Sequence, residues 1–432
     1  MSLSYEKWPF ENRAWEADER WWSACHVPGS ADILLEDPFH WTILSGGPSC
    51  GKSVALSYML RNSAHNGTFV LKLDPFGPSD WKAPEPLGDI FTQIMTRVSQ
   101  VLRDEYWEHP EKLSDLSVTH KEFFRWLVEK YNRPRDYKRW LDGLEKDLAI
   151  AMENVSTAEL EAEAAGLKQA AGMRTQIVDL VNLCRRSGFS DVLVVLDVPA
   201  HLKAEHLDML KEFYTWLEPM HQAGFRCIAA IRESIIDECR LVERAHGRVS
   251  TITLQPTIEQ ALEVAGRHLQ AATHGQVCAL NTLASTVLID HLDQMVTAEF
   301  GQSAPGAWVQ LAQLLLENTG EAGEPLEQAD FRNLRLRFYQ KFMALNITPD
   351  SPRAGVWRGP NFIPLDPGLY DFLLELHRRK GNPLYADQRN NLRKENLHTL
   401  ASRLRAVIEP DEKLWIYVLN RRNEGYWLEN YL

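Results

Sequence analysis

The stretch that decides the fold is Leu44-Ser-Gly-Gly-Pro-Ser-Cys-Gly-Lys-Ser53, which fits the pattern Gly-x-x-x-x-Gly-Lys-Ser/Thr from Gly46 to Ser53. Glycines in this pattern let successive backbone N–H groups point at one anion, because a side chain would collide with the anion or forbid the backbone angles. The lysine reaches the β- and γ-phosphates of a nucleotide, and the last hydroxyl binds Mg²⁺. The sequence therefore predicts a phosphate-binding loop with Lys52 and Ser53 in these two roles.

The residues on either side of the loop predict the strand and the helix that it needs. Residues 40–44 are apolar and β-prone, and residues 54–60 are compatible with a helix. A helix beginning near Ser53 would point its positive N-terminal end at the phosphate. The alternative, a Gly/Pro turn with an incidental lysine, does not require strand, loop and helix in this order. The loop residues predicted to bind the phosphates are Gly46, Gly47, Gly51, Lys52, Ser53 and Val54.

Length and composition predict a cytoplasmic protein of two or three domains. The chain has 432 residues, of which 44% are hydrophobic and 25% are charged, and domains usually hold about 100 to 200 residues. No apolar run approaches the roughly 20 residues of a membrane span, and no secretory signal is visible. The six cysteines are scattered without a Cys-x-x-Cys pair, so we expect neither disulfides nor a zinc site.

The charge is unevenly distributed along the chain. The net charge is −12, but residues 356–432 hold 12 Lys/Arg and 10 Asp/Glu, which leaves 35 minus 49, or −14, for the first 355 residues. The acidic part does not fit a general nucleic-acid binder. The mildly basic end is expected to have different partners.

A second candidate site residue follows the most strand-like run in the sequence. Residues 190–196 end in the consecutive apolar residues Val-Leu-Val-Val-Leu, as in a central parallel strand that is buried on both faces. Asp197 comes next, at the end of the strand where an α/β sheet binds its ligands. We expect Asp197 to hold the Mg²⁺ with Ser53; a solvated strand-end carboxylate is the alternative.

The residue after this aspartate predicts slow hydrolysis. Rapid ATPases usually place an acid there to orient the attacking water, but this chain has Val198. Either Glu233 or His201 performs this task, or turnover is slow. ATPase activity therefore stays open.

The order of elements predicts a parallel-sheet α/β fold. Residues 68–73 and 225–231 form two further strands, and Arg232 follows the latter. We expect Arg232 to lie level with Asp197 near the γ-phosphate and to report whether that phosphate is present. A surface arginine at a strand end is the alternative.

Helices are expected over most of the remaining chain. The predicted helices include residues 87–102, 123–131, 137–152, a projecting Ala/Glu-rich segment at 156–173, and 204–222. A strand, a Pro turn and a capped helix fit residues 251–269. Residues 276–346 resemble an all-helical lid. We thus predict a nucleotide-binding core at 1–255 with a helical insertion at about 80–180, a helical lid at 256–350 and a third domain at 356–432.

These features together resemble the STAND branch of the AAA+ P-loop ATPases, the signal-transduction ATPases with numerous domains, over about residues 8–345. Residues 10–16, Phe-Glu-Asn-Arg-Ala-Trp-Glu, are similar to the family's Phe-x-Gly/Asn-Arg-x-x-Glu element. The resemblance implies that this element packs by the adenine, with Arg13 on the base side. Leu254-Gln-Pro256 and Pro305-Gly306 resemble landmarks of the family's lid. The departures are Val198, Asn12 and the long helical insertion.

The C-terminal part is similar to the winged-helix domain of two-component response regulators. Three landmarks occur in the expected order at residues 361–376, 396–408 and 421–428, the last containing Gly-Tyr-Trp-Leu. This resemblance implies a recognition helix followed by a hairpin wing. The DNA-contacting residues that it implies are Asn396, His398, Thr399 and Arg403 in a groove, with Arg421 and Arg422 at phosphate. A protein-docking role is the alternative, because a surplus of +2 is small for DNA affinity.

The resemblances imply a cytoplasmic signalling switch in which bound ATP or ADP, with Mg²⁺, reorients the winged helix. The partners expected are the nucleotide, double-stranded DNA, a protein that carries the effector or sensor, and further copies of the chain, with no membrane. Two alternatives stay open. One is a DNA-stimulated ATPase, and the other is a nucleotide-stapled scaffold for a partner protein.

Overall fold

The computed structural model of this protein consists of two compact units. Its described residues are 5–11, 13–29, 41–63, 68–73, 86–144, 146–153, 169–190, 192–199, 202, 204–215, 224–246, 248–319, 324–347, 354–385, 397–411, 413–421 and 425–431. The first unit comprises Met1–Pro28, Gly47–Gly51 and Gln255–Leu432, and the second comprises Gly29–Gly46 and Lys52–Leu254. Residues 47–51 of the predicted phosphate loop thus group with the first unit.

The second unit contains a five-stranded, all-parallel sheet, which confirms the α/β class. Its strands are β1 (Trp41–Gly46), β2 (Phe69–Leu73), β3 (Val192–Asp197), β4 (Phe225–Ala230) and β5 (Val249–Leu254), in the spatial order β2-β3-β4-β1-β5. The first strand extends two residues beyond the predicted end, so Gly46 itself is part of β1. Because every connection joins parallel strands, helices must cross over the faces of the sheet.

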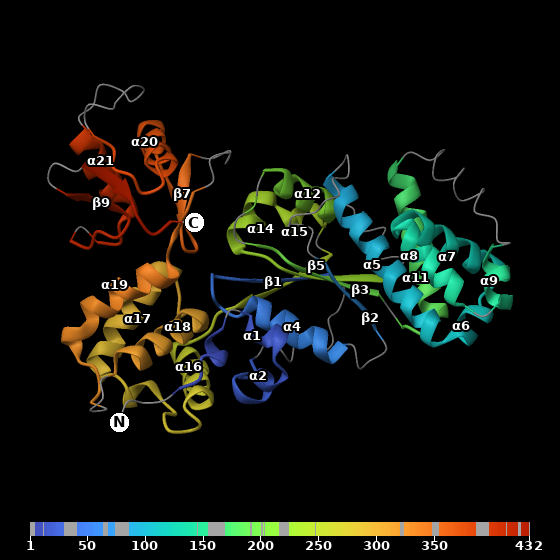
Figure 1. The fold of residues 1–432 in the computed structure, drawn as a ribbon, viewed down its shortest axis with the longest axis horizontal. Coiled ribbons are helices and arrows are strands. Elements are labelled where there is room, and N and C mark those ends of the chain that lie inside the picture. The colour runs from blue at the N-terminus through green and yellow to red at the C-terminus, as the bar shows by residue number, and fades with distance from the viewer. Residues whose placement is uncertain are drawn as a thin grey trace. The chain divides into compact units, whose positions relative to one another are not determined.

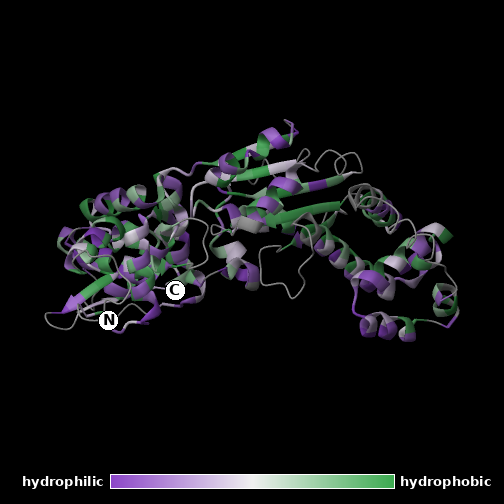
Figure 2. Ribbon diagram, turned by 90° about the horizontal axis from the view of Figure 1, so that it is seen from above, coloured by the Kyte–Doolittle hydropathy of each residue, from purple (hydrophilic) through white to green (hydrophobic). Residues whose placement is uncertain are grey.

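Alternate residues of the strands face two separate apolar layers. On one face, Leu44, Val195 and Ile228 pack with α4 (Lys52–Ser63). On the other face, Ile43 and Val194 join the core that includes the helices of the insertion. Figure 1 shows α4 on one face and α12 (Ala204–Thr215), α14 (Glu233–Cys239) and α15 (Leu241–Arg244) on the opposite one. The hydrophobic colour within the sheet in Figure 2 fits central strands that are buried on both sides, whereas the edge strand β5 is mostly exposed or half-buried.

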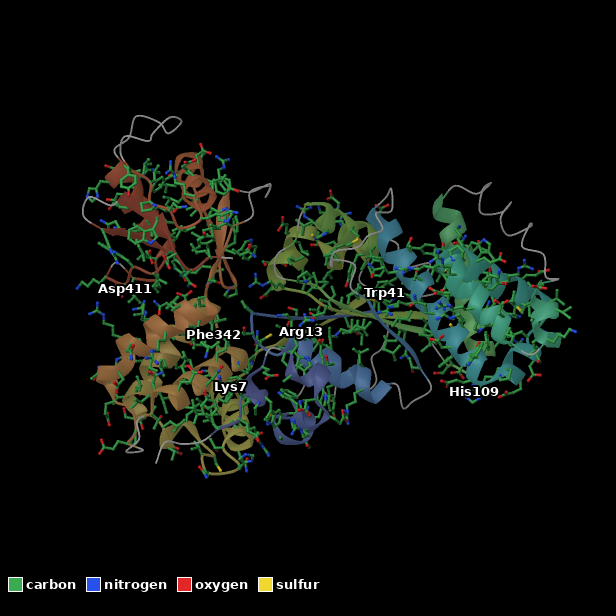
Figure 3. All side chains as sticks on the ribbon, viewed as in Figure 1. Lys7, Arg13, Trp41, His109, Phe342 and Asp411 are labelled. Atoms are coloured by element: carbon green, nitrogen blue, oxygen red, sulfur yellow. The ribbon has the colours of Figure 1, made fainter. Side chains whose placement is uncertain are left out.

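Trp41, labelled in Figure 3, begins β1 and is almost fully buried. Its ring lies 5.1 Å from that of Phe213 in α12, measured between centroids. The indole Nε1 donates a hydrogen bond to the backbone oxygen of Phe225, 3.2 Å away. This bond satisfies the only polar group of a buried tryptophan and ties β1 to β4.

The predicted insertion is helical where the structure describes it. Its helices are α5 (Pro86–Glu108), α6 (Pro110–Ser114), α7 (Val118–Tyr131), α8 (Pro134–Gly143), α9 (Lys146–Glu153) and α11 (Gln169–Arg186). The single helix predicted at 137–152 is wrong, because α8 ends at Gly143 and α9 begins at Lys146. Of the projecting segment at 156–173, residues 156–168 lie outside the described part.

The first unit joins the N-terminal segment to the predicted lid. Three short elements, η1 (Trp8–Phe10), α1 (Ala14–Ala17) and α2 (Glu19–Ala24), lie near the lid helix α16 (Ile258–Ala272). The predicted capped helix is confirmed, and Thr257 caps α16 with the reciprocal bonds of a capping box. The lid continues with α17 (Thr286–Phe300), α18 (Pro305–Asn318) and α19 (Phe331–Phe342).

The C-terminal part belongs to the same unit as the lid. Its elements are β6 (Leu345–Asn346), β7 (Gly355–Arg358), β8 (Asn361–Pro364), α20 (Pro367–Arg378), α21 (Leu397–Ile408), β9 (Val418–Arg421) and β10 (Gly425–Leu428). The expectation that residues 276–346 are all helical is wrong at its end, because β6 pairs with β7. One buried apolar cluster runs from Ala261 in the lid to Leu428 in β10. Lid and C-terminal elements therefore share a core.

No helix in the described part of the chain has both the length and the apolar character needed to cross a membrane.

Candidate functional site

The parallel sheet brings the ends of three strands to one edge. In the register of the sheet, Asp197 at the end of β3 pairs with Ala230, and Ala230 pairs in turn with Leu44 of β1. Two backbone bonds extend this register: Val198 donates to the oxygen of Ala230, and Ile231 donates to that of Leu44, both at 3.0 Å. Asp197 and Gly46 thus end two strands that are separated by β4 alone.

The predicted phosphate loop has the backbone geometry that its glycines allow. Gly46 and Gly51 have φ angles of 147° and 101°, which residues with a side chain rarely adopt. Ser49 has a φ of 55°, an uncommon left-handed conformation for a residue other than glycine. Strained angles of this kind collect where a backbone is shaped to hold a ligand.

Lys52 closes the loop back on its first residue. Its Nζ donates a hydrogen bond to the carbonyl oxygen of Gly46, 2.9 Å away. Lys52 is also the first residue of α4, one residue before the predicted helix start. Ser53 and Val54 follow in the first turn of α4, where backbone N–H groups have no partner within the helix. This arrangement presents a cation and a helix N-terminus at one place.

Arg232 and Glu233 stand where β4 leads into α14. Arg232 is the N-cap residue of α14 and lies two residues beyond Ala230, so it is not level with Asp197 as predicted. Its side chain is partly buried, and this burial lowers the pKa of its guanidinium. Glu233 is exposed in the first turn of α14. His201, the other candidate to activate water, lies outside the described residues.

Val198 faces the core. The side chain is only 6% exposed and belongs to the same apolar cluster as Ile231 and Ile235. An acid at this position would have to bury its charge in the present conformation. The sequence pattern identified the departure at 198 but not the direction of the side chain, which depends on packing between distant strands.

Arg13 occupies a strained position at the start of α1. Its φ is 57°, its side chain is about half exposed, and its Nη1 lies 3.6 Å from Oε1 of Glu16 (Figure 3). The segment around Arg13 is fixed to α16 by aromatic contacts, including those of Phe10 and Trp21 with His268 at centroid distances of 6.2 and 5.7 Å. The element that the sequence singled out therefore packs on α16.

Within the described ranges there is no group of three or more His, Cys, Asp or Glu residues that could hold a metal ion. The predicted Mg²⁺ ligands, Ser53 and Asp197, do not need such a group. Mg²⁺ commonly binds one or two protein ligands together with phosphate oxygens and waters.

The C-terminal candidates for DNA contact lie partly in the described region. His398, Thr399 and Arg403 are exposed on α21, and Arg421 is exposed at the end of β9. The guanidinium of Arg403 forms an ion pair with Asp366, 2.8 Å away. Asn396 and Arg422 lie outside the described residues.

Arg405, two residues after Arg403, connects α21 to β9. It is 8% exposed and donates hydrogen bonds to the oxygen of Val418 and to Oδ1 of Asn420 at 2.7 and 2.9 Å. The guanidinium carbon lies 3.8 Å from the ring centroid of Trp415. Arg405 is therefore structural, which the sequence pattern did not reveal.

No protein-family model matches the sequence, and comparisons with curated proteins and with solved structures find no match either.

Proposed function

We propose that this protein binds ATP or ADP with Mg²⁺ at the loop from Gly46 to Ser53 and acts as a nucleotide-dependent switch of the STAND type. The observation that carries the proposal is the position of this loop. It joins the end of a central parallel strand to the start of a helix, and Lys52 already lies against its first residue at 2.9 Å. In parallel α/β sheets, ligands bind at this edge, where the strand order reverses.

The proposed roles follow from the strand ends. The backbone of Gly46, Gly47 and Gly51 wraps the phosphates while Lys52 neutralises the charge of their oxygens. Ser53 and Asp197 bind Mg²⁺, and the backbone of Val54 contacts the phosphates. Arg232 contacts the terminal phosphate, and Arg13 lies on the side of the base.

Slow turnover is part of this proposal. Val198 follows Asp197 in place of an acid and is buried, and Glu233 at the start of α14 is the described alternative to activate water. If hydrolysis is slow, the protein keeps its nucleotide bound for a long time, and the nucleotide-bound conformation can act as a signal. The nucleotide shifts the protein between states only by its differential affinity for them.

The experiment combines retained nucleotide with turnover. Protein purified without added nucleotide is denatured, and the released ADP or ATP is quantified by anion-exchange chromatography. Phosphate release from added ATP is then measured with Lys52→Ala as the control. We expect retained nucleotide in the wild type, none in the variant, and slow turnover. Brisk turnover without any nucleotide-dependent change in shape would contradict the switch.

A second function, contact with double-stranded DNA through α21 and the β9–β10 hairpin, has separate support in the exposure of His398, Thr399 and Arg403. The pairing of Arg403 with Asp366 and the burial of Arg405 reduce the charge available for phosphate. Docking of a partner protein is the competing role. Retention on DNA over a salt series distinguishes them, because binding dominated by phosphate contacts weakens steeply as salt rises.

A further inference from the structure

The connection between α17 and α18 contacts the tip of the phosphate loop inside the first unit. The backbone N–H of Gly306, in the first turn of α18, donates a hydrogen bond to the oxygen of Ser49, 3.0 Å away. A Cβ atom on Gly306 would lie 3.1 Å from Cβ of Ser49, so the approach depends on a small residue. Residues 47–51 are therefore held by the same helix start that the sequence identified at Pro305.

Gln302 lies in this connection with an unused donor. Its side-chain Nε2 is fully buried and has no hydrogen-bond partner among the residues that the structure describes. A Cβ atom placed on Gly47 would come 2.8 Å from this nitrogen, so the amide is next to the backbone of the loop. A buried N–H group without a partner costs free energy, and such groups are rare in native proteins.

A phosphate oxygen is the acceptor that this position lacks. The loop that passes Gln302 has the sequence and backbone angles of an anion cradle, and phosphates held there would present several negatively charged oxygens. A hydrogen bond to a charged acceptor is stronger than one between neutral groups. The amide is uncharged. Leaving it without an acceptor in the nucleotide-free protein therefore costs less free energy than burying an unpaired lysine or arginine there.

We propose that the side-chain amide of Gln302 donates a hydrogen bond to a phosphate oxygen of the nucleoside di- or triphosphate held by the loop. This inference rests on the proposed nucleotide binding and adds to it a contact from outside the sequence motif. Gln302 lies in the connection between α17 and α18. Its hydrogen bond to the phosphate therefore gives the first unit a contact that exists only in the nucleotide-bound state. Differential contact of this kind is what a ligand needs to shift a conformational equilibrium.

Two substitutions separate this role from packing against Gly47. Gln302→Leu keeps similar volume and removes the donor, and Gln302→Glu keeps the shape but places a carboxylate toward the phosphate. Gln276→Leu and Gln276→Glu are the matched controls, because Gln276 is exposed in the same unit. For each protein, the affinities for Mg-ADP and Mg-ATP are measured by calorimetry, and the melting temperature is measured without nucleotide.

We expect Gln302→Leu to weaken nucleotide binding about 10-fold and Gln302→Glu to weaken it further. The nucleotide-free melting temperature of Gln302→Leu should be equal to or above that of the wild type, since the variant removes an unpaired buried donor. Wild-type affinity in both Gln302 variants would overturn this inference while leaving nucleotide binding intact. A wild-type protein that binds neither nucleotide would overturn both proposals.

Discussion

Lys52 and Gly46 are joined by a hydrogen bond of 2.9 Å between the lysine Nζ and the glycine carbonyl oxygen. The bond connects the start of α4 to the end of β1, so the loop between them has both ends fixed. A lysine in this position can exchange a neutral carbonyl for a phosphate oxygen and gain a charge-assisted bond. This geometry supports the phosphate binding that we propose for the loop.

The backbone of Gly51 is expected to be essential to the loop. Its φ is +101°, and a Cβ atom at this position would meet nothing within 4 Å. Gly51→Ala should therefore act through backbone strain alone and destabilise the protein by about 1–3 kcal/mol, with loss of nucleotide affinity. The measurement is urea denaturation together with a nucleotide titration.

Gly29→Ala is the control for this substitution. Gly29 has equally open surroundings and no such φ angle, so its variant should behave as the wild type. If Gly51→Ala has the stability and nucleotide affinity of the wild type, the loop does not depend on the positive φ angle at Gly51.

Val198→Glu should not create a rapid ATPase. The side chain at 198 lies in the apolar core, so the variant must bury a carboxylate or distort the end of β3. We expect a lower melting temperature and turnover no faster than that of the wild type. Val198→Ala, which removes apolar contacts without adding charge, controls for packing. An increase in phosphate release of 10-fold or more in Val198→Glu would show that this position can face the substrate.

Glu299 and Arg358 form a buried ion pair that ties the lid to β7. Oε1 of Glu299 lies 3.0 Å from Nη2 of Arg358 and also accepts from the hydroxyl of Tyr339 at 2.5 Å. Asn361 donates to Oε2 of the same carboxylate. Removal of one partner leaves the other charge buried, so Glu299→Ala should lower the free energy of unfolding by about 3–5 kcal/mol.

A double-mutant cycle checks this coupling. In Glu299→Ala with Arg358→Ala, no uncompensated charge stays in the core, so the combined loss of stability should be smaller than the sum of the single losses. If the loss of stability in the double mutant equals the sum of the two single losses, within the error of urea denaturation, the pair does not couple α17 to β7 energetically.

His268 should make the stability of the first unit depend on pH. The side chain is 4% exposed, and burial lowers its pKa from about 6.5 to about 4, although a hydrogen bond to the oxygen of Val264 opposes the shift. Between these values the unfolded chain binds a proton that the folded protein does not, so stability rises with pH. A pKa shift of this size lowers the free energy of unfolding by about 3 kcal/mol between pH 7 and pH 4.

The measurement is the free energy of unfolding at several pH values between 4 and 7. His268→Gln removes this titration, so its profile should be flatter than that of the wild type by the same amount. If the wild type and His268→Gln have parallel pH profiles, His268 accepts its proton equally well in the folded protein, beside Phe10 and Trp21, and in the unfolded chain.

The sequence predicted the elements that local patterns determine. The consecutive apolar run at residues 192–196 and the largely apolar run at residues 225–230 are typical of central parallel strands, and both are found in the sheet. Thr257 and Gln260 are three residues apart and form a capping box at the start of the predicted capped helix. These features depend on residues that are close in the chain, so their spacing is sufficient.

Features that depend on distant pairing could not be predicted. The inward direction of Val198 follows from packing with Ile231, and the role of Arg405 follows from the position of Val418. Gln302 and Gly47 are far apart in sequence, and no motif relates them. The sequence could therefore identify the loop but not the residues between α17 and α18 that contact it.

Nucleotide affinity tests the central claim most directly. The measurement is a calorimetric titration of nucleotide-free protein with Mg-ADP and Mg-ATP, compared with Lys52→Ala, whose fold is checked by its melting temperature. We expect one nucleotide per chain in the wild type and a loss of affinity of about 100-fold or more in the variant, because a lysine that neutralises phosphate is removed. Absence of binding in the wild type, or equal affinity in a folded Lys52→Ala, would contradict the account.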